Sequence, residues 1–273
     1  ARASSFMPAV TNYLAKDYEA GYQNWACAQG SNGEMYFGNS QGLLVYDGYR
    51  WTLHKVPGNH IVRSVYVKED RIYVGAFEEF GYFKYSEAGT LRYHSLSKFL
   101  KNFPMENNEI WNIVELDGRI YFQSFSAWFS YDGKMVHAFR NRQQQPLYFY
   151  TQNGHIYTQM IDEDFYEFDG KDFLHLFPRS QVNDDNVVAL LPDGDDSFLM
   201  VTENNGLFRY NGDITPWKTD IDAELKKQRV NRAVMTNDSI FMIGTVLNGI
   251  YAIDRKGHCL WHFNLDNRLD NNT

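Results

Sequence analysis

The sequence predicts an all-β fold built from repeated four-stranded antiparallel blades, a β-propeller. One pattern occurs six times: two blocks of aromatic and β-branched residues, separated by a small-residue turn, end in an aromatic–Asp–Gly-like tail. The residues that anchor successive copies are 39, 46, 37, 42 and 43 positions apart: Tyr46, Tyr85, Tyr131, Phe168, Tyr210 and Ile253. A period of roughly 40–50 residues with several strands per copy is typical of propeller blades.

Each copy provides four strands. Residues 71–75 and 239–244 are almost all apolar, which indicates strands that are buried on both faces. Apolar residues at helical spacing are not found in these blocks. In the first copy we expect strands near the following residues: 25–28, 35–38, 43–46 and 51–55.

Turn chemistry separates the strands. Asn-Gly and Asp-Gly pairs favour tight hairpins because both residue types tolerate positive φ. Such pairs stand between the first and second strands of four copies, at 32–33, 117–118, 153–154 and 193–194. Others stand between the third and fourth strands, at 47–48, 132–133, 169–170 and 211–212. These regular turns share one face of each blade, so the opposite face carries the irregular loops.

We expect one partial propeller domain over residues 1–273. Residues 1–21 form a leading segment, of which 6–18 is a candidate loose outer strand. The expected blades cover 22–57, 60–100, 108–140, 146–178, 185–219 and 229–264. Residues 265–273 resemble the approach to another blade, which predicts a fragment of a seven-bladed propeller. A closed six-bladed ring is the alternative.

Composition excludes some functions. A hydrophobic content of 44% suffices for a core, and a net charge of −8 argues against binding of a phosphate backbone. No apolar run reaches the ~18 residues that cross a bilayer, so we expect no membrane contact through this domain. Cys27 and Cys259 fall in different blades and are expected to be buried small hydrophobes rather than a disulfide.

No catalytic or metal-binding motif stands out. The sequence has no Gly-x-Ser-x-Gly, no His-Glu-x-x-His, no phosphate loop and no Cys-x-x-Cys. His258 and His262 would lie about 13 Å apart on a strand, too far for one ion. The acidic turn at 193–196 lacks the downstream glutamate of a calcium loop. We therefore expect no catalytic residue, no metal and no cofactor.

The irregular face is the predicted binding face, because loops on a rigid scaffold concentrate binding residues. It combines the second-to-third turns of the blades with connectors at 101–108, 140–146, 179–186 and 226–232. Trp128 is a candidate platform for a sugar ring or a peptide, with a core position as the alternative. The candidate ligand-binding residues are Asn39, Glu78, Glu79, Phe80, Trp128, Asp162, Glu203, Asn204 and Asn248.

Five segments carry a family resemblance: 23–25 (Gln-Asn-Trp), 33–39, 42–48, Trp51 and 74–83. Through these segments the chain resembles the two-component regulator propellers of Bacteroidetes, and the resemblance extends over nearly its whole length. That resemblance implies the periplasmic part of an inner-membrane sensor whose output is a histidine kinase or a DNA-binding domain. It also implies other sensor domains of the same protein as partners, signalling through a homodimer, and ligands derived from polysaccharides. The chain departs from the family pattern where Gln123 and Gln159 replace a glycine.

The predicted function is therefore a non-catalytic, extracytoplasmic sensor propeller that responds to an oligosaccharide or another small ligand. The first alternative is a glycan lyase or hydrolase that pairs Glu78 with Asp162 or Glu203 at a glycosidase-like separation. The second alternative is a scaffold that docks protein partners on the propeller rim. We expect no contact with nucleic acid through this domain.

Overall fold

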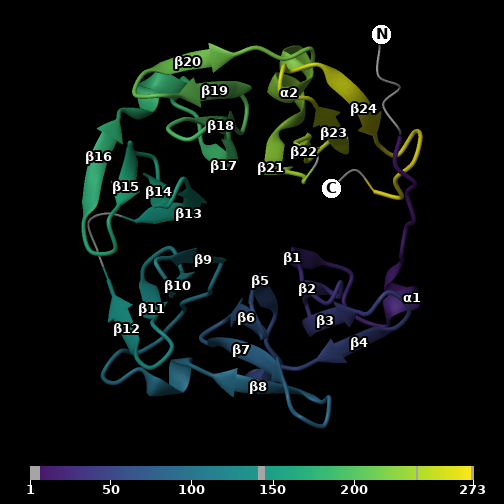
Figure 1. Ribbon diagram of the computed structural model, residues 1–273, viewed down its shortest axis with the longest axis vertical. Coiled ribbons are helices and arrows are strands. Elements are labelled where there is room, and N and C mark those ends of the chain that lie inside the picture. The colour runs from purple at the N-terminus through teal and green to yellow at the C-terminus, as the bar shows by residue number, and fades with distance from the viewer. Residues whose placement is uncertain (1–6, 141–144, 238, 272–273) are drawn as a thin grey trace. The chain divides into compact units, whose positions relative to one another are not determined.

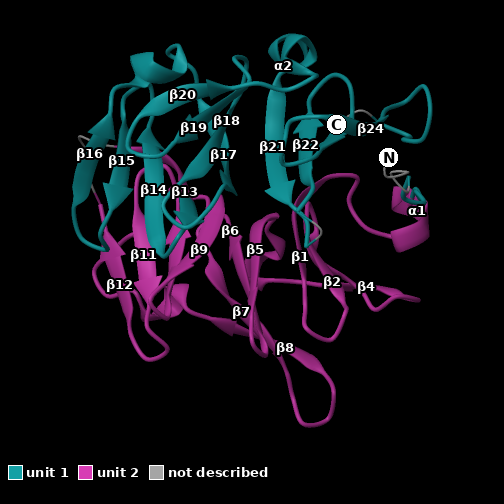
Figure 2. Ribbon diagram, turned by 45° about the horizontal axis from the view of Figure 1, so that its top comes forward, with its two compact units in different colours: residues 1–12, 150–273 teal, residues 13–149 magenta. Residues whose placement is uncertain are grey.

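The computed structural model describes residues 7–140, 145–237 and 239–271. These residues contain six antiparallel sheets, each made of four strands that are consecutive in the chain (Figure 1). The predicted all-β fold of six four-stranded blades is confirmed. The chain divides into two compact units: unit 2 is residues 13–149, and unit 1 is residues 1–12 and 150–273 (Figure 2).

Unit 2 contains blades 1 to 3. Their strands are β1 (Asn24–Gln29), β2 (Met35–Asn39), β3 (Gly42–Tyr46) and β4 (Trp51–His54); β5 (Val62–Lys68), β6 (Arg71–Ala76), β7 (Phe80–Tyr85) and β8 (Leu91–Ser95); β9 (Asn112–Leu116), β10 (Arg119–Gln123), β11 (Trp128–Tyr131) and β12 (Val136–Phe139). Short helical segments occur at α1 (Ala15–Tyr18), η1 (Pro57–Asn59) and η2 (Ser97–Phe99).

Blades 4 to 6 follow, and the boundary between the units falls within the first strand of blade 4. Their strands are β13 (Pro146–Gln152), β14 (His155–Met160), β15 (Phe165–Phe168) and β16 (Phe173–Phe177); β17 (Val187–Pro192), β18 (Phe198–Thr202), β19 (Leu207–Tyr210) and β20 (Ile214–Trp217); β21 (Val230–Met235), β22 (Phe241–Thr245), β23 (Ile250–Ile253) and β24 (Cys259–Phe263). The connectors carry η3 (Arg179–Val182) and α2 (Asp222–Gln228).

The core of each unit lies between blades that face each other. In blades 2 to 5 the second strand is buried on both faces, as in β18, where every residue is buried, whereas β2 and β22 include half-buried residues. For example, the ring centroid of Phe80 in blade 2 lies 4.6 Å from that of Phe122 and 5.0 Å from that of Phe129, both in blade 3. The first and fourth strands are more exposed, as in β1 and β4.

A glycine or a glutamine at the end of the second strand controls how closely the next blade approaches. Gly38 and Gly75 leave room for Val62 and Ile110 of the following blade. In blade 3, Gln123 instead donates from Nε2 to the Pro146 and Leu147 carbonyls and accepts from the Phe149 amide. In blade 4, Gln159 donates to the Asp185 carbonyl and accepts from the Val187 amide. These glutamines therefore replace close backbone packing with buried hydrogen bonds.

The Asp-Gly turns between third and fourth strands share one construction. Gly48 and Gly133 have φ of 96° and 93°, where a Cβ is strained, as expected from the sequence. Replacing either with valine should lower the free energy of unfolding by about 1–3 kcal/mol. Urea denaturation measures this free energy. Unfolding midpoints that are unchanged in both variants would contradict the turn assignment. A Cβ at either position meets no atom within 4 Å, so the loss would come from the backbone alone.

The aspartate of these turns closes the loop through its carboxylate. Asp132 accepts from the amides of Lys134 and Met135, and Asp47 and Asp169 make the same pair of bonds. These backbone amides lower the pKa of each carboxyl group, because they stabilise its ionised form.

A pH dependence follows from that direction. A carboxyl group whose folded pKa is depressed contributes stability above its unfolded pKa and loses it as the pH falls through the folded pKa. We therefore expect the melting temperature to drop as the pH is lowered below about 4. The Asp47→Asn, Asp132→Asn and Asp169→Asn triple variant should show a smaller drop, measured by thermal melts from pH 7 to pH 3. An equally steep drop in the triple variant would show that the turns do not contribute.

Two expectations about the fold are wrong. Of the candidate outer strand at 6–18, Phe6 lies outside the described residues, and the rest contains helix α1 and no strand. Val10 packs against the core of blade 6 within unit 1. Cys27 and Cys259 are free, as expected, but both are exposed, because each lies on a first or a fourth strand rather than in the buried middle of a blade.

Candidate functional site

The irregular face of unit 2 carries a group of five side chains that we call the aromatic–arginine cluster: Trp25, Arg63, Trp111, Phe125 and Tyr148. Trp25 and Arg63 occupy the same place in two blades, where the pairing of the first and second strands shifts by one residue. Trp111 precedes β9 at the corresponding position, and its amide donates to the Gln123 carbonyl. At such a shift one strand has an extra, unpaired residue, and its side chain leaves the regular alternation of the strand.

Arg63 is the centre of this cluster. Its guanidinium carbon lies 3.8 Å from the ring centroid of Trp25 and 4.8 Å from that of Trp111, a double cation–π contact. Its Nε lies 2.5 Å from Glu109 Oε1 on the connector between blades 2 and 3. Nη1 is buried and has no hydrogen-bond partner among the described residues. The guanidinium is therefore held in one plane by two rings and one carboxylate.

The aromatic side chains extend from Arg63 in two directions. Trp111 stacks on Phe125, with centroids 5.7 Å apart, and Phe125 meets the edge of Tyr148 at 5.9 Å. On the other side, Trp25 donates from Nε1 to Ser40 Oγ, in the turn between β2 and β3. Trp25 is 37% exposed, so part of its indole remains open to a ligand. A flat, partly exposed ring beside a fixed guanidinium suits contact with a sugar.

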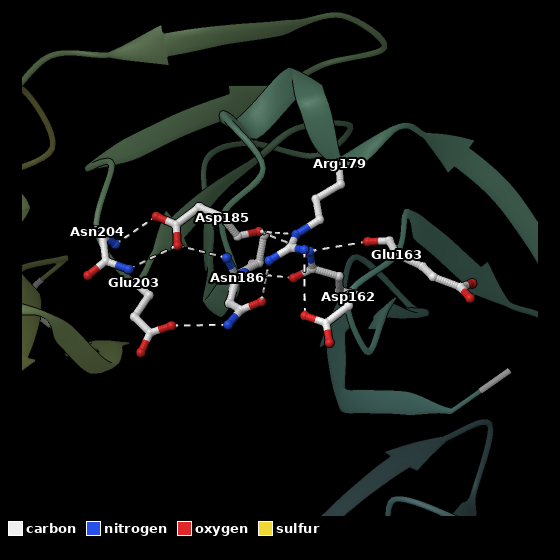
Figure 3. Close-up of polar contacts among 9 residues, drawn as sticks. Asp162, Glu163, Arg179, Asp185, Asn186, Glu203 and Asn204 are labelled. Atoms are coloured by element: carbon white, nitrogen blue, oxygen red, sulfur yellow. Dashed lines mark hydrogen bonds and ion pairs between the residues drawn. The ribbon is translucent and has the colours of Figure 1, made fainter.

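A polar network occupies the irregular face of unit 1 (Figure 3). Its centre is Asp185, which is 6% exposed. The Asp185 carboxylate accepts from the Asn186 and Asn204 amides, at 2.8 and 2.7 Å, and from the side-chain amides of Asn204 and Asn205. Four donors thus satisfy this buried carboxyl group.

From Asp185 the network continues through Asn186 to acidic and basic side chains (Figure 3). Asn186 accepts from Arg179 at 3.2 Å and donates to Glu203 at 3.1 Å. Glu203 forms a further ion pair with Arg229, and Arg179 lies 3.6 Å from Asp162. The network thus ties the turns of blades 4 and 5 to the connectors on either side of blade 5.

Three predicted residues belong to this network: Asp162, Glu203 and Asn204. Asp162 and Asn204 are exposed, whereas Glu203 is enclosed between Arg229 and Asn186. Asn248, in blade 6, donates to the Tyr251 hydroxyl at 2.7 Å and accepts from Asn264. Asn248 therefore holds its own turn closed.

The other predicted residues lie in unit 2 and differ in exposure. Asn39 is fully buried. Its Oδ1 accepts from the Gly21 amide, and its Nδ2 donates to the Gly21 carbonyl and to Asn24 Oδ1. Glu78 is exposed and accepts from the Asn107 amide.

Glu79 Oε1 accepts from three hydroxyl groups of β8 and the residues after it. The pKa of Tyr93 is raised, mainly because its hydroxyl group is buried and also because the Glu79 carboxylate lies beside it.

The two predicted aromatic contacts are buried. Phe80 is 0% exposed and Trp128 is 4% exposed, and Trp128 stacks on Phe139 with an interplanar angle of 7°. The structure thus gives Trp128 the core position that the sequence left as the alternative. Trp25 and Trp111 are instead the tryptophans that flank Arg63.

A signal for the cluster exists in the sequence. Aligning the copies on their first strands, rather than on the residue equivalent to Tyr46, places Trp25, Arg63 and Trp111 at one position in three successive blades. Within the described ranges, no group of three or more His, Cys, Asp or Glu residues could hold a metal ion. In the same residues no helix is long and apolar enough to cross a membrane.

Comparison with solved structures identifies the architecture. The chain is similar to the β-propeller domain of Cps50 (Swd1) from Myceliophteria thermophila, with a TM-score of 0.60, 9% identity, and coverage of 82% of this chain and 80% of that one. The fold is a β-propeller. No protein-family model and no curated protein sequence matches the chain.

Two other solved structures are also similar to the chain. The extracellular domain of the hybrid two component system BT4673 from B. thetaiotaomicron, also described as a one component system, matches with a TM-score of 0.70 and 18% identity over 93% of this chain. The match covers only 35% of that extracellular domain, about a third of its length. Virginiamycin B lyase from Staphylococcus aureus matches with a TM-score of 0.68 and 12% identity, covering 90% of this chain and 85% of the lyase. The first similarity supports the resemblance to regulator propellers at the level of fold.

Proposed function

We propose that this propeller is a non-catalytic, ligand-sensing part of a bacterial signal-transduction regulator and lies outside the cytoplasm. The observation that carries the proposal is the similarity to the extracellular domain of BT4673 over 93% of the chain. In this proposal the propeller works with further sensor domains of the same protein, and a homodimer transmits the signal. The output is a histidine kinase or a transcription regulator.

The proposed ligand is an oligosaccharide that contacts the irregular face of the blades. The aromatic–arginine cluster supports this choice, because Trp25 offers a partly exposed ring next to Arg63 and Glu109. Stacking on an indole and hydrogen bonds to planar charged groups are how a protein holds a polyhydroxylated ring without covalent chemistry.

A thermal-shift screen against plant and host oligosaccharides tests the proposal. A ligand present at 100 times its dissociation constant should raise the free energy of unfolding by about 2.7 kcal/mol. We expect one class of saccharide to raise the melting temperature, with no cleavage product detected by mass spectrometry. Failure of every saccharide to bind would reject the proposed ligand class.

A propeller enzyme that acts on glycans is the second candidate, and the similarity to virginiamycin B lyase is the observation that favours it. The acids named for this role are engaged by other groups: Asp162 by Arg179, Glu203 by Arg229, and Glu78 by the Asn107 amide. The same screen separates the two functions, because only an enzyme turns the stabilising ligand into product.

A further inference from the structure

A cavity of about 270 Å³ lies over blade 5 in unit 1, and we call it the blade-5 cavity. Trp217, at the end of β20, forms its aromatic wall, and the connectors with η3 and α2 supply the polar side chains. The volume is close to the lower limit for small-molecule sites, which suits one sugar unit of a longer chain.

Four of the six polar side chains that line this cavity are uncommitted. Lys218 and Lys226 have no ion-pair or hydrogen-bond partner among the described residues, and the same holds for the side chains of Gln181 and Asn183. In the adjacent polar network, by contrast, Asp185, Asn186 and Glu203 all bond to neighbours. Asn205 connects the two regions, since it lines the cavity and donates to Asp185.

The cavity lining carries more positive than negative groups. The protein has a net charge of −8, yet two ammonium groups and one carboxylate line the cavity. That carboxylate, Asp222, accepts on Oδ1 from the amide and the hydroxyl of Thr219. A local excess of positive charge in an acidic protein selects an anionic ligand.

We propose that the blade-5 cavity binds a uronic acid unit, with the sugar ring against Trp217 and the carboxylate at Lys218 and Lys226. The two free amides bond the ring hydroxyls. This inference rests on the proposed function, because it assigns a ligand class to a saccharide sensor. It is separate from the aromatic–arginine cluster, which lies in unit 2.

The test measures binding of digalacturonate and diglucuronate to the whole chain by isothermal titration calorimetry. Each uronate is compared with its dimethyl ester, which keeps the rings and removes the charge. We expect a uronate to bind at least about tenfold more tightly than its ester, and added salt to weaken its binding.

Variants locate the site. Lys226→Met and Lys218→Met should each weaken uronate binding about tenfold, and Lys226→Arg should retain most of it. Lys227→Met is the matched control: Lys227 is exposed on the same helix but does not line the cavity, so its loss should change the dissociation constant less than about twofold. Circular dichroism confirms that each variant is folded.

The outcomes separate the two proposals. Uronate binding that depends on Lys218 and Lys226 but not on Lys227 supports the inference. Saccharide binding that none of these variants weakens, or equal binding of acid and ester, overturns the inference and leaves the sensor function standing. No binding of any saccharide in the oligosaccharide screen overturns both this inference and the proposed saccharide ligand class.

Discussion

Replacing Gly75 with alanine should destabilise the protein by about 3 kcal/mol. A Cβ at this position would lie 2.4 Å from Ile110 Cγ2, 2.6 Å from Ile110 Cβ and 2.4 Å from Ser64 Oγ. Ile110 is fully buried and branched at Cβ, so it cannot swing away. Relief therefore requires blade 3 to move away from blade 2, which opens the core around Phe80 and Phe122. The midpoint of urea unfolding measures the loss.

The repeat supplies the control for this experiment. Gly244 stands at the equivalent position of blade 6, where a Cβ would meet only the Arg232 carbonyl, at 3.7 Å. Gly244→Ala should change stability by less than about 1 kcal/mol. Gly38→Ala should fall between the two, because its Cβ would lie 2.8 Å from the Val62 carbonyl oxygen. Equal effects in all three variants would show that the loss reflects strand propensity and not contact between blades.

The local features of the fold could be predicted because neighbouring residues determine them. The pairs Asp117-Gly118 and Asn153-Gly154 form tight hairpins with positive φ at both residues. At Asn32-Gly33 only the glycine has positive φ, and the Gly30 amide bonds the Glu34 carbonyl across a longer loop. The dipeptide alone does not fix the loop length, because flanking residues decide which pair closes the hairpin.

The candidate site could be predicted less well, because it depends on contacts between blades. Phe80 and Trp128 stand beside turns in the sequence, but each is covered by aromatic rings from another strand or blade. Trp25 and Trp111 stand within or next to a strand, yet the local shift in pairing brings them against Arg63. Which side chain is exposed is thus set by the neighbouring blade, and sequence periodicity within one blade does not contain that information.

The glutamines at the ends of β10 and β14 show the same dependence on the neighbouring blade, and they lead to the second prediction. Gln159→Leu should cost about 3–4 kcal/mol. Gln159 is 1% exposed, and its loss leaves the Val187 amide and the Asp185 carbonyl without their bonds of 2.8 and 3.0 Å. Leucine has a similar volume, so the lost hydrogen bonds cause most of this destabilisation, although Arg179 Nε still donates to the Asp185 carbonyl at 3.4 Å. Gln152→Leu in the same blade is the control, because among the described residues the Gln152 side chain bonds only to Asn153, at the surface.

A change of charge at the same position separates hydrogen bonding from packing. In Gln159→Glu, the protonated carboxyl group can still donate to the Asp185 carbonyl and accept from the Val187 amide. Burial disfavours the ionised form, so the folded pKa of this carboxyl group lies above its unfolded value. The stability of this variant should therefore approach that of the original protein below the unfolded pKa of about 4.3, and fall as the pH rises through the folded pKa. Urea unfolding of both proteins at pH 4 and pH 7 measures the difference. A pH-independent difference would show that packing, and not these two hydrogen bonds, holds the first strand of blade 5 and the Asp185 network in place.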